Sequence, residues 1–362
     1  MNDPVAYHDN LETVAEDESE TIEDMNETMR TILDRVAKDE SHAYRSVHAK
    51  SHGIIAGKLR IHDDLPDELR QGIFAAPGTH DAILRISTNP GDLLHDGVSV
   101  PRGLALKVLN VEGERLDTDY ESASQDFVMI NGPAFSAKSA REFAKTLKLL
   151  AATTDRAEWG KKLLSRALQG VGKVLEDTVG ASATIQTLGG APNTHPLGET
   201  FYTQTAYRYG DYVAKLQLVP VSQNLRSLSG KEIDTAGRPD ALREDIDRTM
   251  RSESVEWDLR VQLLRDLDKQ PVEDATVVWD EIDFPFATVA TVTANSQPAW
   301  TQKRSAAVDD AMRFAPWNGI AAHRPMGSIN RARKSPYDRS AAFRERVNGR
   351  AIRDPDRADH LG

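Results

Sequence analysis

Short apolar runs separated by turn residues constrain the fold of this chain most. Four of them follow one another closely, at residues 54–61, 82–87, 104–109 and 127–130, and each is bounded by Gly, Pro or Asp. Runs of this length and spacing predict β-strands that pair antiparallel with their sequence neighbours. Four further strand-like runs follow later, at residues 201–209, 212–219, 257–264 and 286–292.

Helical patterns lie ahead of and between these predicted strands. From about Glu20 to Glu40, apolar residues recur at helical spacing in an acidic segment, which predicts an amphipathic helix. We interpret residues 1–40 as an N-terminal acidic helical arm and residues 41–362 as one larger domain. Strands grouped between helices indicate an α+β fold built on an antiparallel sheet or barrel. Further helices are predicted at residues 137–151, 159–175 and 239–250, a loop at 180–200, and a loop followed by a helix at 306–346.

Composition excludes several classes of function. The 362 residues contain no cysteine, which excludes disulfides, thiolate metal sites and covalent haem attachment through a C-x-x-C-H motif. The net charge of −11 argues against binding to nucleic acid or to an anionic membrane. The sequence has no apolar run of the ~18 to 20 residues that a membrane span requires, and its acidic start is unlike a signal peptide. We therefore expect a cytoplasmic location.

The stretch around Tyr337 carries a candidate iron ligand. A phenol has an ordinary pKa near ~10 and binds iron well only as phenolate, so a tyrosine ligand needs a fixed cation beside it. Arg333, four residues before Tyr337, is the candidate cation. If one helix carries both residues, they share a face, and Arg344 returns to that face two turns later.

A different helix boundary also fits this stretch. Ser335 suits an N-cap, Pro336 the first helical position and Asp338 the end of a capping box. In that case Arg333 lies ahead of the helix, and the shared face holds only Tyr337 and Arg344.

Three upstream motifs combine with this stretch into a pattern that resembles the haem catalases. In order, they are Arg45-Ser46-Val47-His48-Ala49-Lys50, Arg85-Ile86-Ser87-Thr88 and Pro101-Arg102-Gly103-Leu104-Ala105-Leu106-Lys107. The Arg333-x-x-x-Tyr337 pair closes the set, and looser similarity extends over residues 125–133 and 314–318. The resemblance covers most of the chain from Arg45 to Arg344.

The resemblance implies a site for haem b, with His48 above the iron and Tyr337 as the iron ligand. Ser87 would orient the His48 imidazole through a hydrogen bond, and Val47 precedes the histidine in the haem pocket. Because the chain has no cysteine, the haem would be held without a covalent bond to sulfur.

Charged and aromatic residues complete the implied haem site. Arg45, Arg85 and Arg344 would pair with the two haem propionates, because a carboxylate that leaves water needs charge-assisted partners. Arg333 would modulate the phenolate ligand. Phe127 lies in the segment that leads to the aromatic cover of the haem.

The chain departs from the family at the distal asparagine, whose position falls near Ala123. Ser124 or Gln125 is the candidate replacement, and we assign Gln125 to the catalytic set. The chain is also shorter than ordinary catalases. These departures favour a compact, catalase-related protein of the mini-catalase or peroxidase-like kind.

The function implied by the resemblance is haem-dependent peroxide processing on a catalase-like antiparallel β-barrel with surrounding helices. We expect a peroxidase that uses organic hydroperoxides and has weak catalase activity, acting as a monomer or homodimer on hydrogen peroxide or an organic hydroperoxide. The alternatives are a non-catalytic haem-binding protein, a fatty-acid hydroperoxide rearrangement enzyme like the allene oxide synthases, and a cofactor-free lipocalin-like barrel. His48 and His52, with His42 nearby, form a possible metal pair, although no third ligand follows at a supporting spacing.

Overall fold

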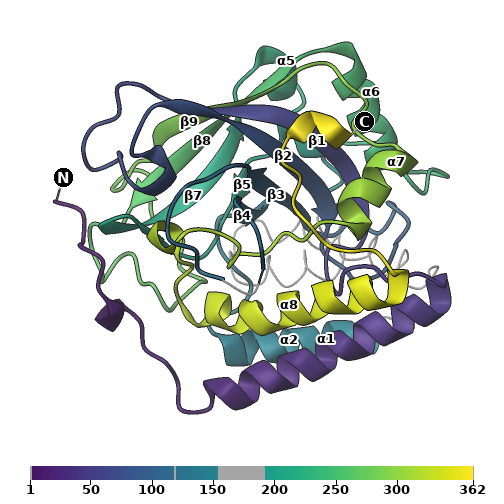
Figure 1. Ribbon diagram of the computed structural model, residues 1–362, viewed down its shortest axis with the longest axis horizontal. Coiled ribbons are helices and arrows are strands. Elements are labelled where there is room, and N and C mark those ends of the chain that lie inside the picture. Colours follow the sequence, from purple (N-terminus) through teal and green to yellow (C-terminus); the bar gives the residue numbers. More distant parts are fainter. Residues whose placement is uncertain (1, 118–119, 154–191, 362) are drawn as a thin grey trace.

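An antiparallel β-barrel forms the centre of the molecule (Figure 1). The computed structural model describes residues 2–117, 120–153 and 192–361. In this part of the chain, nine strands form one sheet in the order β5-β4-β3-β2-β1-β9-β8-β7-β6. Pairing between β5 and β7 joins the ends of the sheet, so that all the strands except β6 form a closed barrel of eight. The strands are β1 Ser51–Ile61, β2 Gly78–Thr88, β3 Arg102–Val108, β4 Gln125–Ile130, β5 Phe201–Tyr202, β6 Tyr207–Tyr209, β7 Tyr212–Pro220, β8 Val255–Leu263 and β9 Ala287–Ala294.

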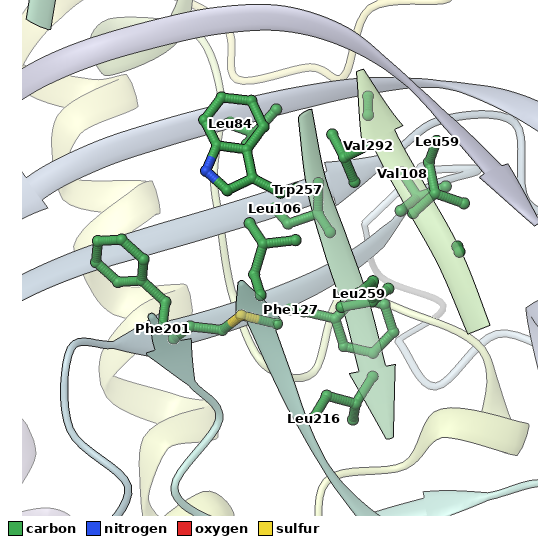
Figure 2. Close-up of a cluster of buried hydrophobic side chains, with 14 of the residues drawn as sticks. Leu59, Leu84, Leu106, Val108, Phe127, Phe201, Leu216, Trp257, Leu259 and Val292 are labelled. Carbon is green, nitrogen blue, oxygen red and sulfur yellow. The ribbon is translucent and has the colours of Figure 1, made fainter. Parts of the chain in front are cut away.

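The barrel interior holds the main hydrophobic core (Figure 2). Because side chains alternate along a strand, every second residue of β2, β3 and β4 points inward. Leu84 of β2 lies opposite Leu106 of β3, and both are fully buried in this core. The residues between the inward-facing ones, such as Arg85 and Ser87, therefore point out of the barrel.

The strand predictions are confirmed, with one correction. The run at residues 201–209 was predicted as a single strand, but β5 ends at Tyr202 and β6 begins at Tyr207. Gln204 lies between them with a positive φ of 60°, a left-handed backbone conformation that interrupts a strand. The split lets the chain close the barrel through β5 and then form a hairpin with β7.

Three helices run side by side below the barrel in Figure 1, namely α1, α2 and α8. The α-helices of the described chain are α1 Glu18–Glu40, α2 Ala140–Thr153, α5 Gln223–Arg226, α6 Ala241–Ser252, α7 Gln302–Ser305 and α8 Ser328–Asn348, with a π-helical turn at Ala306–Asp310. The apolar stripe of α1, which includes Met25 and Met29, packs against Leu147 of α2 and Ala332 of α8. None of the helices described is long and apolar enough to cross a membrane. The helix predicted at residues 159–175 lies outside the described residues.

The boundary of α8 decides between the two interpretations of the Tyr337 stretch. The helix begins at Ser328, so the interpretation of Ser335 as its N-cap is wrong. Pro336 lies inside the helix, where it cannot donate a backbone hydrogen bond to the preceding turn. One helix therefore carries Arg333, Tyr337 and Arg344, as the shared-face interpretation predicted.

Candidate active site

A cavity of about 560 Å³ lies between the outer face of the barrel and α8. The loop before β1 contributes His48 to its wall, β2 contributes Ser87, and α8 contributes Tyr337. A second cavity of about 1000 Å³ is also lined by His48 and Tyr337, and the two cavities share Val47, Val128 and Met129.

His48 is held in an unusual backbone conformation. Its φ is +55°, which is uncommon for a residue with a side chain and is tolerated where the surroundings impose it. Its backbone N–H donates to the carbonyl of Asn89 at 2.7 Å, and its Nδ1 lies 3.1 Å from Oγ of Ser87. Because Nδ1 is engaged by Ser87, Nε2 is the nitrogen that is left for a ligand.

Gly103 provides the space for the His48 ring. It lies opposite Ser87 in the pairing of β2 with β3, and a Cβ at this position would come within 2.5 Å of Cε1 of His48. A glycine is therefore required for the imidazole to lie flat against the strand.

The electrostatic environment keeps His48 neutral. Burial, together with the nearby positive charges of Arg85, Arg333 and Arg45, lowers the pKa of its imidazole to about 3. A neutral imidazole at ordinary pH can accept a proton, which is the state that a general base requires.

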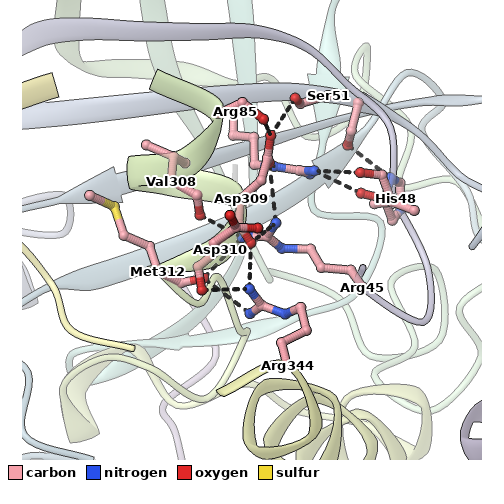
Figure 3. A network of polar contacts seen from close by, with 12 residues as sticks. Arg45, His48, Ser51, Arg85, Val308, Asp309, Asp310, Met312 and Arg344 are labelled. Atoms are coloured by element: carbon pink, nitrogen blue, oxygen red, sulfur yellow. Dashed lines mark hydrogen bonds and ion pairs between the residues drawn. The ribbon is translucent and has the colours of Figure 1, made fainter. Parts of the chain in front are cut away.

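Three arginines gather at one edge of the first cavity, around Asp309 (Figure 3). Arg45 and Arg85 bind its carboxylate at 3.2 and 2.7 Å. Arg344 of α8 donates to the backbone carbonyls of Met312 at 3.1 Å and of Asp309. Two guanidinium groups therefore bind the Asp309 carboxylate and a third binds backbone carbonyls beside it, which leaves this edge of the cavity positively charged.

The cavity wall formed by α8 carries Tyr337 with its predicted cation. Nη2 of Arg333 donates a hydrogen bond to the phenol oxygen of Tyr337 at 3.0 Å. Arg333 is buried, and although burial alone would lower its pKa, the neighbouring oxygens of Tyr337 and Tyr207 raise it. The guanidinium therefore keeps its charge beside the phenol.

Two of the predicted site residues do not reach the cavity. Gln125 and Phe127 lie on the face of β4 that points into the barrel, since they alternate with the outward-facing Val128. Oε1 of Gln125 accepts a hydrogen bond from the backbone of Ile320 at 3.0 Å, and Phe127 packs edge to face against Tyr207. Because both side chains point into the barrel, the assignments of Gln125 to catalysis and of Phe127 to cofactor binding need correction.

Ser124, the other candidate for the asparagine, also lies elsewhere. Its hydroxyl donates to the Asp354 carboxylate at 2.6 Å and lies 3.1 Å from Nζ of Lys107, so Ser124 belongs to a buried network with these two residues. No amide side chain therefore replaces the family asparagine in the wall of the first cavity, as far as the described residues show.

Several residues at the site were not predicted from the sequence. Asp309 was not predicted. The prediction of three arginines at one buried site was a signal for it, because their mutual repulsion requires a nearby carboxylate. Arg313 and Phe314 also line the first cavity, while Met29 of α1 and Phe143 of α2 line the second.

The three histidines considered as a metal site do not converge. His42 binds Asp310 through Nε2 at 2.9 Å, and Nε2 of His52 lies 3.1 Å from Oγ1 of Thr88. In the described part of the chain, no group of three or more histidine or carboxylate side chains is arranged to hold a metal ion.

The cavity residues fit a flat iron cofactor that carries carboxylates. Nε of Arg344 and Nε of Arg313 are buried and have no hydrogen-bond partner among the described residues. An unpaired buried donor is costly, so a carboxylate that reached this edge would satisfy it. Tyr337 offers an oxygen ligand paired with a cation, which suits a ferric centre.

Comparisons with known proteins identify the fold. The chain is similar to the structures of a fungal catalase (TM-score 0.59, 19% identity, 86% of this chain), catalase A from Saccharomyces cerevisiae (0.61, 20%, 95%) and a bacterial catalase (0.57, 17%, 89%). It spans 61%, 67% and 63% of the length of those chains. No protein-family model matches the sequence, and neither does any curated protein. The fold is thus catalase-like, an antiparallel barrel surrounded by helices.

Proposed function

We propose that this chain, whose fold is that of the catalases, binds haem b and cleaves peroxides. The observation that carries the proposal is that His48 and Tyr337, from the loop before β1 and from α8, line the same cavity. Tyr337 would be the iron ligand and Arg333 its paired cation, while the arginines at the cavity edge would receive the propionates. Bound there, haem would supply the redox-active iron at which the O–O bond breaks.

The protein's own part in the reaction is proton transfer by His48. If Nδ1 donates its proton to Ser87, Nε2 is unprotonated and would take the proton of a bound peroxide, ROOH. It then returns that proton to the departing oxygen, which leaves as a neutral alcohol or as water. Such a positioned acid–base group contributes a rate factor on the order of 10² to 10⁴.

Organic hydroperoxides are the proposed main substrates. The second cavity reaches His48 and is lined by apolar side chains that include Pro101, Phe135 and Phe143. A wall of this kind has room for a hydrocarbon group. Among the described residues, amide side chains such as Asn131 and Gln204 line only the second cavity and none lines the first, which supports weak catalase activity and peroxidase turnover with an organic electron donor.

A non-catalytic haem-binding protein is the second candidate. The displacement of Gln125 and Ser124 from the cavity favours it, because a site that only binds haem needs no group to hold peroxide. The pairing of His48 with Ser87 argues against it, since haem binding alone does not require an oriented imidazole.

The test is a visible spectrum of the purified protein followed by two assays. We expect a Soret band, donor oxidation with cumene or linoleate hydroperoxide, and slow oxygen release from hydrogen peroxide, compared as kcat/KM. Efficient oxygen release without donor oxidation would contradict the peroxidase assignment. A coloured protein without turnover would support the haem-binding alternative, and a protein that remains colourless with added haem would contradict both.

A further inference from the structure

Asp309 is the centre of a hydrogen-bond network that the proposed reaction does not use directly. It is the second-to-last residue of the π-helical turn Ala306–Asp310, an irregular helix type often found at functional sites. One carboxylate oxygen, Oδ1, accepts from Nε of Arg85 at 2.7 Å and from Nη1 of Arg45 at 3.2 Å. The other, Oδ2, accepts from the hydroxyls of Ser51 at 2.6 Å and Ser305 at 2.7 Å.

The four donors fix the carboxylate, and the carboxylate in turn fixes Arg85. Asp309 is 6% exposed, so solvent does not compete strongly for these bonds. Although burial opposes ionisation, the charges of Arg85 and Arg45 and the two serine hydroxyls hold the pKa of Asp309 at about 2. The carboxylate is therefore charged, and hydrogen bonds to a charged acceptor are roughly twice as strong as neutral ones.

Arg85 connects Asp309 to the backbone of His48. While its Nε binds Asp309, its Nη2 donates to the carbonyl of His48 at 2.9 Å and to that of Ala49 at 3.2 Å. A guanidinium is planar and rigid, so binding along two edges prevents its rotation. The carbonyl that it holds belongs to the residue with a φ of +55°, whose conformation needs support from its surroundings.

The strand geometry makes this support act on the imidazole itself. Arg85 and Ser87 lie on the same outward face of β2, so one holds the His48 backbone while the other contacts its ring. The carbonyl that Arg85 holds and the Nδ1 that contacts Ser87 both belong to His48. A small rotation of the His48 backbone would therefore move Nδ1 away from Ser87. The orientation of the ring thus depends on the position of the Arg85 guanidinium.

We propose that Asp309 is a positioning residue for His48, acting through Arg85. It touches neither substrate nor cofactor; it holds the guanidinium that fixes the strained His48 backbone and so aims the imidazole into the cavity. The catalytic consequence rests on the proposed function, whereas the effect on the His48 backbone belongs to the protein alone.

The first measurement uses the ligand-free protein and Asp309→Asn. The amide can place its oxygen toward Arg85 and its nitrogen toward the serines, so the change removes the charge and keeps the shape. We expect the backbone amides of His48 and Ala49, which donate to Asn89 and Pro90, to exchange hydrogen about tenfold faster, because a neutral acceptor is weaker by roughly half. Amides in β8 should exchange at the wild-type rate.

The second measurement uses the haem-loaded protein. For Asp309→Asn we expect kcat for cumene hydroperoxide to fall about tenfold at unchanged KM, the pattern of an interaction that matters in the transition state. Binding of iron-free protoporphyrin IX, followed by fluorescence, should stay within about twofold, since backbone carbonyls still hold Arg45 and Arg344 in place. Asp310→Asn is the matched control, because the neighbouring carboxylate pairs with His42 instead.

The outcomes separate this proposal from the proposed function. Unchanged exchange at His48 would overturn the positioning role, and so would equally faster exchange throughout the barrel, which indicates general destabilisation. Local faster exchange in a protein that lacks peroxide activity would support the role of Asp309 and contradict the peroxidase assignment. Should Asp309→Asn fail to fold, Ser305→Ala removes one donor from the same carboxylate, and a smaller increase confined to His48 and Ala49 is the supporting result.

Discussion

The cavity has a helix side and a sheet side, and the two are built differently. The helix side consists of Arg333, Tyr337 and Arg344 of α8. The sheet side consists of His48, Arg85, Ser87 and Gly103. On the helix side, Arg333 contacts Tyr337 at 3.0 Å through i,i+4 spacing within one regular helix. On the sheet side, His48 contacts Ser87, which lies 39 positions away in the sequence. His48 lies in a loop, so no regular helix or strand imposes its left-handed backbone conformation.

The two sides should differ in how strongly substitutions elsewhere in the molecule affect them. The helix side depends on local geometry, so its pair should survive changes elsewhere in the molecule. The sheet side depends on contacts that come from several strands and from the turn at Asp309, so small changes at a distance should disturb it. The following predictions test this contrast, and they run from the largest expected effect to the smallest.

Loss of the proposed ligand oxygen should have the largest effect. Tyr337→Phe removes the only oxygen on the helix side that we propose to bind iron, so the protein should fold and retain little or no haem. The Soret absorbance per protein measures this loss. Tyr207→Phe is the matched control, because its buried phenol oxygen has no hydrogen-bond partner among the described residues. Full haem occupancy in Tyr337→Phe would move the ligand to another residue.

Loss of the His48 imidazole should spare haem binding and impair turnover. In His48→Asn we expect peroxide cleavage to fall by a factor on the order of 10² to 10⁴, which a positioned acid–base group contributes. The measurement is donor oxidation at matched haem content. His42→Asn, a change in the same segment at a residue that pairs with Asp310, should leave the rate unchanged. Normal turnover in His48→Asn would show that another group moves the proton.

Gly103→Ala tests the sheet side without removing a functional group. The added methyl would meet the His48 ring at 2.5 Å, so the ring must shift and lose its alignment with Ser87. We expect kcat to fall about tenfold with haem content unchanged, since a displaced acid–base group loses part of its contribution. Gly78→Ala in β2, whose new Cβ would meet its nearest neighbour at 4.0 Å, is the control. Equal rates in the two variants would mean that the imidazole tolerates displacement.

Lowering the pH should affect activity less than any of these substitutions, as long as the protein remains folded. The pKa of buried His48 and of buried His323 is lowered to about 3, and that of His195 to about 4. In the unfolded chain these side chains would titrate near ~6.5, so the unfolded state binds more protons below that pH. Their stabilising contribution is therefore complete above pH ~6.5 and is lost as the pH falls toward the folded pKa values.

The pH dependence is read from two curves measured on the same samples. We expect kcat/KM to be flat between about pH 5 and 8, without an inflection near ~6.5. The thermal midpoint should decline over the acid part of this range. An activity inflection near pH 6.5 in fully folded protein would indicate that His48 titrates like an exposed histidine.

The sequence predicted the elements well where the pattern is local. Short apolar runs bounded by turn residues identified the barrel strands. The spacing of Arg333, Tyr337 and Arg344 predicted the helix side in one of two interpretations, because a helix places residues four and seven apart on one face. The single prediction of this kind that needed correction is residues 201–209, where the positive φ of Gln204 interrupts the run. No local pattern marks that residue as left-handed.

What the tertiary structure alone decided is which side chains meet. The motif similarity named Arg45 and Arg85, but their common carboxylate, Asp309, lies more than 220 positions along the chain, and no spacing rule connects them. Gln125 and Phe127 were assigned from the motif resemblance, which gave their place in the sequence but not the face of β4 on which they lie. Local sequence determines periodicity, since it acts through the backbone of neighbouring residues; the meeting of distant residues depends on how the barrel closes and on which face its helices cover.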